Sequence, residues 1–202
     1  MYLNFHNQKI LEKQIEELKP VAGVCIFIDI CGSTEIKNET LKHWIVLIGN
    51  TIRMCSSTFI LFHNNVVKLI GDEIMIFIPD EQITSANENY ATVLDLLISC
   101  LSLNSPEIEN ITLKLKATIH YCTNAYNISF ISEADDYYGN DIDLTARLMK
   151  LKASKKKIVL SETFYQLVNA IDSSILTNTT DKLEFQFEGI NGSTAYREMT
   201  IE

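Results

Sequence analysis

Two aspartates stand where a strand is predicted to end, which is where side chains project into a cleft rather than into a core. Asp29 ends the apolar run VAGVCIFIDI, and Asp72 lies at the tip of a predicted hairpin between two apolar segments. If the two strands are neighbours in one sheet, the carboxylates converge and offer oxygen ligands to divalent metal ions. Taken singly, each aspartate also suits a turn or a cap, so it is their joint placement that favours a metal site.

The turn that follows Asp29 supplies a second kind of group. Gly32, Ser33 and Thr34 break the strand, and Thr34 suits the N-cap of the next helix. Backbone N–H groups at a helix N-terminus favour anions, so this turn is suited to binding a polyphosphate.

A third polar segment, YYGNDIDLTARL, covers residues 137–148. Gly139 precedes a predicted helix on which Asp143 and Arg147 are four residues apart and therefore share one face. The alternative interpretation of this pair is a salt bridge on the surface of a helix.

Hydrophobic periodicity and turn residues predict the elements that must position these groups. Residues 111–120 alternate strictly and predict a half-buried strand, with residues 127–131 as its partner. The predicted helices cover residues 2–19, 34–54, 83–101, 141–152 and 162–171, and the other strands cover residues 21–30, 66–70, 73–79, 157–161, 183–187 and 194–199.

Helices and strands alternate in this order, but hairpins are present as well. The pattern predicts an α/β (α+β) sandwich with a mixed, mainly antiparallel sheet and an N-terminal helix, rather than a doubly wound parallel sheet. The sequence contains neither GxGxxG nor a Walker A motif, so no Rossmann or P-loop site is indicated. We expect two parts, an N-terminal helix in residues 1–19 and one domain in residues 20–202.

Composition limits the class of protein. The chain has 202 residues, of which 47% are hydrophobic and 21% are charged, enough to bury a core. Its net charge of −9 argues against a protein that coats nucleic acid, because phosphate neutralisation needs a basic face. Metal ions still allow an acidic protein to bind an anionic nucleotide.

The cysteines and the apolar runs indicate the cellular compartment. The five cysteines form no CxxC motif, which favours buried free thiols in a reducing, cytoplasmic environment. No signal peptide and no membrane-spanning segment are predicted, so we expect no membrane partner. The four histidines show no ligand spacing among themselves, and none is expected to be catalytic.

Three segments together resemble a known family. FIDICGST and KLIGDE resemble the first and second metal motifs of class III nucleotidyl cyclases, the adenylate and guanylate cyclases, and YYGNDIDLTAR resembles the helix that carries their Asn-x-x-x-Arg motif. KIVLSE resembles the strand that follows in this family. The resemblance runs from about residue 20 to residue 198, and it implies the family's ferredoxin-like, palm-like sandwich.

The resemblance also implies an activity. Members of the family convert a nucleoside triphosphate into a 3′,5′-cyclic nucleotide and pyrophosphate, and they dimerise head to tail. Asp29 and Asp72, with the carbonyl of Ile30, would bind two Mg²⁺ or Mn²⁺ ions, and Arg147 would stabilise charge on the α-phosphate. A homodimer would be two-fold symmetric and would contain two sites.

Two further positions concern the base of the substrate. Lys68 and Asp136 align with the base-contacting residues of adenylate cyclases, and they offer a donor and an acceptor to adenine, which disfavours guanosine triphosphate. The size of the chain and its altered pocket instead resemble Pycsar-type pyrimidine cyclases, which make cyclic UMP or cyclic CMP in bacterial anti-phage defence. We expect a stand-alone cyclase of that type, with an adenylate cyclase as the alternative.

Two departures from the family pattern affect the substrate and the rate. The ribose-binding Asn of the family is Asp143 here. Either Asp143 is protonated and donates, or Asn140 replaces it as the donor, or turnover is weak. The Lys that meets the terminal phosphates aligns with Glu188. Either another cation compensates, one of Lys155, Lys156 and Lys157 or a second metal ion, or Glu188 points away. The lysine run is alternatively a solvated turn.

Two other classes of protein are compatible with these residues. A degenerate homolog that binds nucleotide without efficient turnover would explain Asp143 and Glu188, although Asp29, Asp72 and Arg147 are all present. A metal-dependent polymerase-like or phosphohydrolase domain would use the same fold, but the third motif disfavours it.

Overall fold

A single sheet forms the centre of the molecule. The computed structural model describes residues 3, 7–63, 66–102, 114–130, 136–151, 157–190 and 192–201. The strands are β1 (Val21–Ile30), β2 (Val66–Ile70), β3 (Glu73–Pro79), β4 (Leu115–Asn127), β5 (Tyr137–Tyr138), β6 (Lys157–Ser161), β7 (Leu183–Phe185) and β8 (Thr194–Thr200). They form an eight-stranded sheet in the order β2-β3-β1-β4-β6-β8-β7, and β5 pairs with β4. Only β4 and β6 pair in parallel among the described strands, so the predicted mixed, mainly antiparallel sheet is confirmed.

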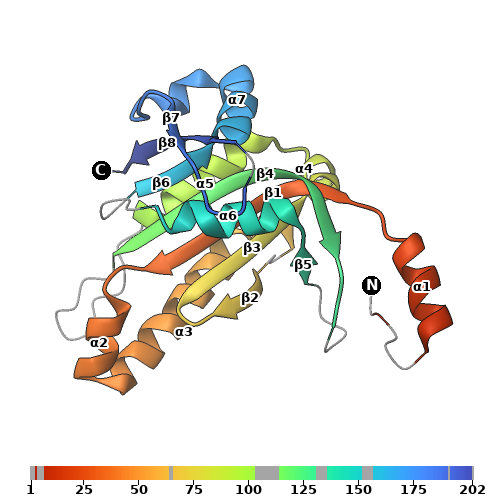
Figure 1. Ribbon diagram of the computed structural model, residues 1–202. Coiled ribbons are helices and arrows are strands. Elements are labelled where there is room, and N and C mark those ends of the chain that lie inside the picture. Colours follow the sequence, from red (N-terminus) through yellow and green to blue (C-terminus); the bar gives the residue numbers. More distant parts are fainter. Residues whose placement is uncertain are drawn as a thin grey trace.

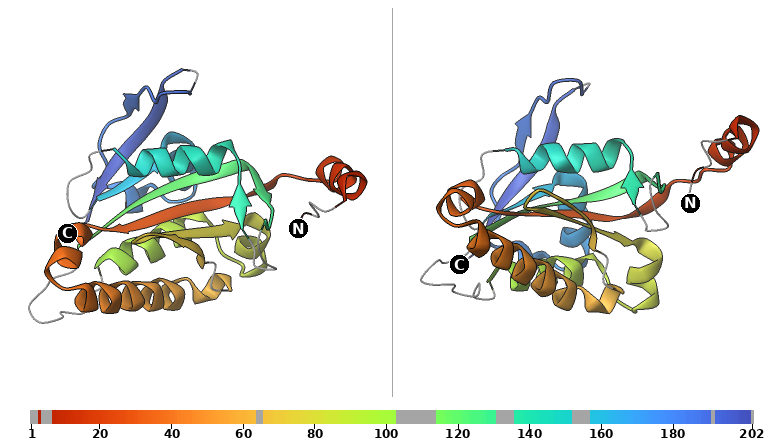
Figure 2. Two further views of the ribbon diagram at one scale, coloured as in Figure 1. Left: turned by 60° about the horizontal axis from the view of Figure 1, so that its bottom comes forward. Right: turned by 90° about the horizontal axis from the view of Figure 1, so that it is seen from below.

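The helices cover the two faces of the sheet unequally. They are α1 (Gln8–Glu16), α2 (Ser33–Glu39), α3 (Leu41–Thr58), α4 (Asp80–Ser85), α5 (Tyr90–Ser102), α6 (Asn140–Met149) and α7 (Glu162–Ile171), with short 3-10 helices η1 (Ile60–Phe62) and η2 (Ser173–Leu176). Helices α3, α5 and α7 bury the larger core on one face, whereas α6 lies across the other (Figures 1 and 2).

The continuous apolar run of β1 follows from its position. β1 is paired on both sides, with Ile26 opposite Ile76 of β3 and opposite Ile119 of β4. Both of its faces are covered, since Ile26 belongs to the larger core and Phe27 packs under α6. A strand buried on both faces needs apolar residues at every position, which explains why Asp29 stands out near its end.

Helix α1 stands apart from the sheet, and none of its residues is buried (Figure 1). It is shorter than the helix predicted over residues 2–19, because the side chain of Asn7 caps its start by accepting a hydrogen bond from the N–H of Ile10. The division into residues 1–19 and 20–202 stays a prediction. No helix in the described ranges is both long and apolar enough to span a bilayer.

The single helix predicted over residues 83–101 is wrong, because the structure has two helices there. The chain turns at Asn87, which has a left-handed backbone with φ 58°. The side chain of Asn89 then accepts hydrogen bonds from the N–H groups of Ala91 and Thr92 and caps the start of α5. The apolar spacing continues across the break, so periodicity alone did not reveal it.

The strand pair predicted over residues 111–120 and 127–131 is also wrong. Strand β4 continues to Asn127 and pairs with β1 along its length, with Cys122 opposite Gly23 and Ala125 opposite Val21. The segment 127–131 therefore begins as the end of β4 rather than as its partner, and residues 111–113 lie outside the described residues. Nor is the strand half-buried, because Thr118 and His120, which belong to the polar side of its alternating pattern, are both buried.

Two helix boundaries near the predicted site differ from expectation. The single helix predicted over residues 34–54 is wrong, because the extended backbone of Thr40 divides it into α2 and α3. Helix α2 begins at Ser33, with Gly32 rather than Thr34 in the N-cap position. Gly32 has φ 75°, a left-handed conformation in which the chain leaves β1. Helix α6 ends at Met149 rather than at residue 152. The predicted hairpins, β2 with β3 and β7 with β8, are confirmed.

Candidate active site

Three carboxyl groups gather where β1 ends beside the β2–β3 hairpin. Because β1 and β3 pair with Ile28 opposite Ile74, the end of β1 lies next to the turn that carries Asp72. The side chains of Asp29 and Asp72 are within hydrogen-bonding reach of each other, and Glu73, the first residue of β3, joins them. Burial and the charge of Asp29 raise the pKa of Glu73 to about 7.

A lysine balances this cluster from the neighbouring strand. Lys116 of β4 lies opposite Asp29, and its Nζ is 2.9 Å from Asp29 Oδ2. Burial raises the pKa of Asp29 although Lys116 lowers it, and the nearby Asp72 raises it further. Burial lowers the pKa of Lys116, but the hydrogen bond and charge of Asp29 outweigh this and raise it.

The cluster fits divalent cations. Carboxylate oxygens are the ligands that Mg²⁺ and Mn²⁺ prefer, and three carboxyl groups converge here beside the ammonium group of Lys116. Burial is the main cause of the raised pKa values of Asp29 and Glu73, and the neighbouring carboxylates add to it. A bound cation would add positive charge to the cluster.

The residues that follow Asp29, which the sequence suggests as a phosphate-binding turn, differ in their exposure to solvent. Ile30 is buried at the end of β1. In the following turn Ser33 is buried and Thr34 is exposed, and the N–H of Ile36 donates to the carbonyl of Gly32. The phosphate site at this turn stays a prediction.

Arg147 is held in place within its own chain. Its Nε donates to Asp143 Oδ2 at 2.9 Å, and its guanidinium also donates to the backbone carbonyl of Glu188. Asp143 is therefore an acceptor for Arg147, whereas Asn140 is exposed in the first turn of the same helix. Helix α6 approaches β4 so closely that a Cβ on Gly139 would lie 2.2 Å from the carbonyl oxygen of Asn124.

A cavity of 380 Å³ lies beside Arg147, between α6 and the β7–β8 hairpin. Lys150 lines it one turn after Arg147, and its charge also reaches Glu73. Glu188 lines the same cavity and is exposed, so a nearby cation is available to offset its charge. Lys155 and Lys156 lie outside the described residues, as does the side chain of Lys157.

Lys68 and Asp136, far apart in sequence, form an ion pair of 2.7 Å between Nζ and Oδ1. Tyr138 completes the group, since its hydroxyl donates to Asp136 Oδ2 at 2.7 Å and the Lys68 Nζ lies 4.5 Å from the centre of its ring. The hydrogen bond to Asp136 raises the pKa of Tyr138 to about 12. The structure thus joins the two residues that the sequence singled out for the base.

Sequence reasoning missed Glu73, Lys116, Lys150 and Tyr138. Glu73 and Tyr138 lie inside the quoted motifs, and Lys150 follows Arg147 at a spacing of three, which places it on the same side of the helix. Lys116 gave no signal, because it is one polar position in an alternating strand and only the register brings it to Asp29.

The chain also matches a family model. The model of the adenylate and guanylate cyclase catalytic domain covers residues 16–198. The chain belongs to this family. It is a class III nucleotidyl cyclase domain, an enzyme of the phosphorus-oxygen lyase class, and nucleotide substrates, dimers and two divalent metal ions are typical of such cyclases. No curated protein matches the sequence.

Solved cyclase structures share the fold of this cyclase domain. The adenylyl cyclase CyaB from P. aeruginosa has a TM-score of 0.70 at 14% identity, with 92% of this chain and 97% of that chain covered. The guanylyl cyclase Cya2 has a TM-score of 0.72 at 11% identity, with 92% and 95% covered. A rhodopsin-guanylyl cyclase core with converted specificity, in complex with ATPαS, has a TM-score of 0.69 at 15% identity, with 92% and 99% covered. At these identities the likeness supports the fold and leaves the base open.

Proposed function

We propose that this cyclase domain converts a ribonucleoside triphosphate into a 3′,5′-cyclic nucleotide and pyrophosphate in a site built on Asp29 and Asp72. The 3′-oxygen forms a bond to the α-phosphorus, the bond from that phosphorus to the bridging oxygen breaks, and pyrophosphate leaves. The observation that carries the proposal is the meeting of the two carboxylates from separate strand ends in a chain of this family.

Asp29, Asp72 and the carbonyl of Ile30 would hold two Mg²⁺ or Mn²⁺ ions, with Glu73 as a further carboxylate. Bound ions of this kind polarise the α-phosphate, favour ionisation of the 3′-hydroxyl and neutralise the β- and γ-phosphates. Lys116 now neutralises Asp29 at 2.9 Å, so we expect its ammonium group to move toward the phosphates when a cation binds.

Positive and donor groups on and near α6 would bind the rest of the substrate. Arg147 would stabilise charge at the α-phosphate, which is a role worth about two to three orders of magnitude in rate for one donor. Asn140 would donate to the ribose in place of Asp143, whose carboxylate accepts from Arg147. Lys150 would take the place of the lysine that the family has where Glu188 stands here.

The phosphates and the second protomer complete the proposed site. The turn formed by Gly32, Ser33 and Thr34 would direct backbone N–H groups at the polyphosphate. We propose a two-fold symmetric homodimer, because family members combine metal ligands of one protomer with base-binding groups of the other.

Lys68, Asp136 and Tyr138 would read the base. A lysine donor beside a carboxylate acceptor complements a ring nitrogen next to an exocyclic amine, and adenine and cytosine both present this pattern. Our first candidate is a pyrimidine triphosphate, following the resemblance to pyrimidine cyclases, with cyclic UMP or cyclic CMP as product. Cyclic AMP is the alternative product, favoured by the Lys68–Asp136 pair itself.

Purified protein incubated with Mn²⁺ and each of the four ribonucleoside triphosphates tests this proposal. We expect one triphosphate to yield cyclic nucleotide and pyrophosphate in equal amounts. Asp29→Asn should lose the activity, and Asp95→Asn, an exposed aspartate of α5, should keep it. Release of inorganic phosphate instead of pyrophosphate would favour a phosphohydrolase, and absence of turnover with a folded dimer would refute the proposal.

A catalytically weak nucleotide-binding homolog is the second candidate. It is favoured by the contacts of Arg147 with Asp143 and with the Glu188 carbonyl, which engage the arginine before any substrate binds. Calorimetric binding of a triphosphate without conversion would support this candidate.

The proposed role in anti-phage defence rests on the same resemblance. Bacteria that express the chain, together with an effector that responds to its cyclic nucleotide, would be challenged with phage. We expect fewer plaques with the unaltered chain than with Asp29→Asn, and equal plaque numbers would refute this role.

A further inference from the structure

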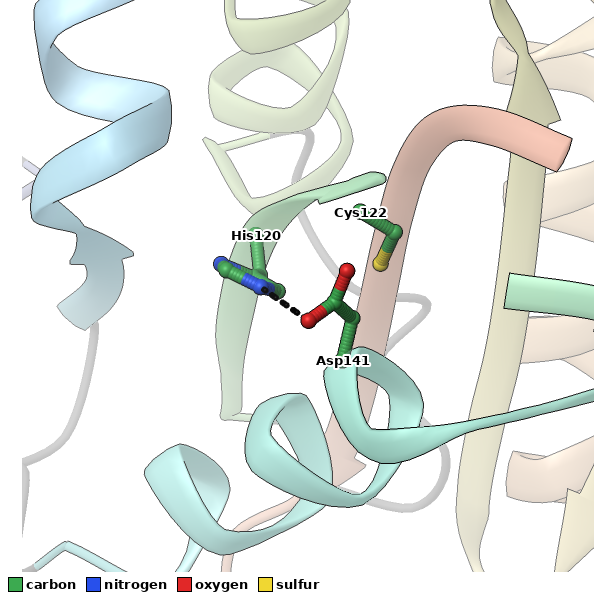
Figure 3. Close-up of side chains that lie close together, drawn as sticks. All are labelled: His120, Cys122 and Asp141. Carbon is green, nitrogen blue, oxygen red and sulfur yellow. Dashed lines mark ion pairs between the residues drawn. The ribbon is translucent and has the colours of Figure 1, made fainter. Parts of the chain in front are cut away.

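A second group of ligating side chains lies under α6. His120 and Cys122, two residues apart on β4, point to the same side of the sheet, and Asp141 in the first turn of α6 faces them (Figure 3). One ligand atom from each residue, a histidine nitrogen, the Cys122 sulfur and an Asp141 oxygen, lies within 4.8 Å of the other two. None of the three residues has a part in the proposed cyclase reaction.

The His120 ring is a buried group without a partner on one side. Its residue is 5% exposed, and its Nε2 has no hydrogen-bond partner. The Nε2 is directed at Asp141 Oδ1 but is 3.9 Å away, which is too far for a hydrogen bond. A buried polar atom of this kind needs a ligand or a water to offset the cost of burial.

We propose that His120, Cys122 and Asp141 bind a zinc ion through Nε2, Sγ and Oδ1. A thiolate, an imidazole and a carboxylate suit Zn²⁺, and the thiolate disfavours Mg²⁺ and Ca²⁺. Ligand atoms of a tetrahedral zinc ion are about 3.5 Å apart, so the group must contract by about 1 Å. A water on the side of Asp141, whose side chain is 21% exposed, completes the tetrahedron.

Neighbouring groups already orient two of the three proposed ligands, His120 and Asp141. The Nδ1 of His120 lies 3.3 Å from the Thr163 hydroxyl, and donation from Nδ1–H to this oxygen leaves Nε2 free to bind metal. Asp141 Oδ2 accepts hydrogen bonds from the backbone N–H groups of Thr123 and Asn124 at 2.7 and 2.9 Å, so Oδ1 is available. Outer contacts of this kind are typical of built metal sites.

The position of the ion assigns it a structural role. His120 and Cys122 are buried and Asp141 is partly buried, so the surrounding protein leaves a substrate little access to the ion. The ion would fasten the first turn of α6 to β4, and α6 also carries Arg147. Zinc binding therefore fixes the helix that presents the arginine.

Cobalt titration of the metal-free, reduced protein tests the proposal, because Co²⁺ bound to a thiolate gives charge-transfer absorption in the near ultraviolet. We expect one equivalent of Co²⁺ to produce this band, and one equivalent of Zn²⁺ to displace it and to raise the melting temperature. Cys122→Ser should abolish the band, and Asp141→Asn should weaken Co²⁺ binding at least about tenfold. No band, as expected if a water alone fills the space, would overturn the proposal.

Matched variants separate this site from the other thiols and from the carboxylate cluster. Cys100→Ser, from the buried thiol pair of Cys55 and Cys100 with sulfurs 3.9 Å apart, should keep the band, and so should Asp29→Asn. Loss of the band in either variant, or its persistence in Cys122→Ser, would overturn the assignment. If Cys122→Ser does not fold, the variant Thr163→Val is the deciding test, because it keeps all three ligands. It should weaken Co²⁺ binding about 10–100-fold without changing the shape of the band. Unchanged affinity would count against the site.

Discussion

Replacement of Glu73 by glutamine is expected to stabilise the metal-free protein at alkaline pH and to leave it unchanged in acid. Glu73 is half-buried beside Asp29 and Asp72, and burial with the charge of Asp29 raises its pKa to about 7 from an ordinary value of 4.5. The folded protein therefore holds this proton more tightly than the unfolded chain. The stability that depends on it is complete below about pH 4.5 and is lost as the pH rises through about 7.

The size of the effect follows from the pKa. The folded-state value lies about 2.5 above the ordinary one, and each pH unit corresponds to about 1.4 kcal/mol. Because the carboxyl group is only half-buried, solvent screening reduces the resulting free energy to about 1–2 kcal/mol. For a chain of this length that corresponds to a melting temperature about 3–6 °C higher for Glu73→Gln at about pH 8.5.

Thermal unfolding followed by circular dichroism, in a metal chelator and from about pH 4 to about pH 8.5, measures this difference. Glu81→Gln, an exposed glutamate of α4, is the control and should follow the unaltered protein. The reasoning is refuted if Glu73→Gln and the unaltered protein show the same pH dependence. Addition of Mn²⁺ at alkaline pH should stabilise the unaltered protein more than Glu73→Gln, because the ion pairs with the carboxylate.

Four further outcomes are expected. Asp29→Asn should reduce Mn²⁺-dependent cyclase turnover by about three orders of magnitude, as measured by product formation, with a melting temperature no lower than that of the unaltered protein. Arg147→Lys should lower kcat about 10²–10³-fold with little change in KM, which steady-state kinetics would show. Lys68→Met should reduce discrimination among the four triphosphates, measured as ratios of kcat/KM, and an unchanged ratio would remove Lys68 from the base site. Gly139→Ala should lower the free energy of unfolding by about 2–4 kcal/mol, because its Cβ would collide with the Asn124 carbonyl. Gly49→Ala in helix α3 should instead raise this free energy by up to about 1 kcal/mol, and denaturant titration would measure both changes.

Local patterns predicted the fold well where a signal was confined to one element. The apolar run before Asp29 identified β1, and the glycine-aspartate tip at Asp72 identified the β2–β3 hairpin. Prediction failed where the signal depended on neighbours. The apolar spacing of residues 83–101 continued across a break made by Asn87 and Asn89, and the strand predicted to end at residue 120 continues to Asn127 along β1.

The residues of the candidate site likewise divide into those that the sequence could name and those that it could not. Asp29, Asp72 and Arg147 could be named from the sequence because each lies at a strand end or on a helix face next to a glycine turn, and because their motifs resemble a family. Lys116 could not be named, since only the pairing of β4 with β1 brings its ammonium group to Asp29. Nor does any spacing in the sequence indicate that the charge of Lys150 acts on Glu73.

By itself the sequence determined the order of the elements, the family and the carboxylates at the strand ends, because periodicity and turn chemistry act over a few residues. Only the tertiary structure decided which charges meet. The contacts of Lys116 with Asp29 and of Lys68 with Asp136, and the approach of Asp141 to His120, join residues that are 21 to 87 positions apart. Strand register and the packing of α6 bring these distant residues together. Neither can be predicted from a short segment of the sequence, because both depend on contacts between separate elements.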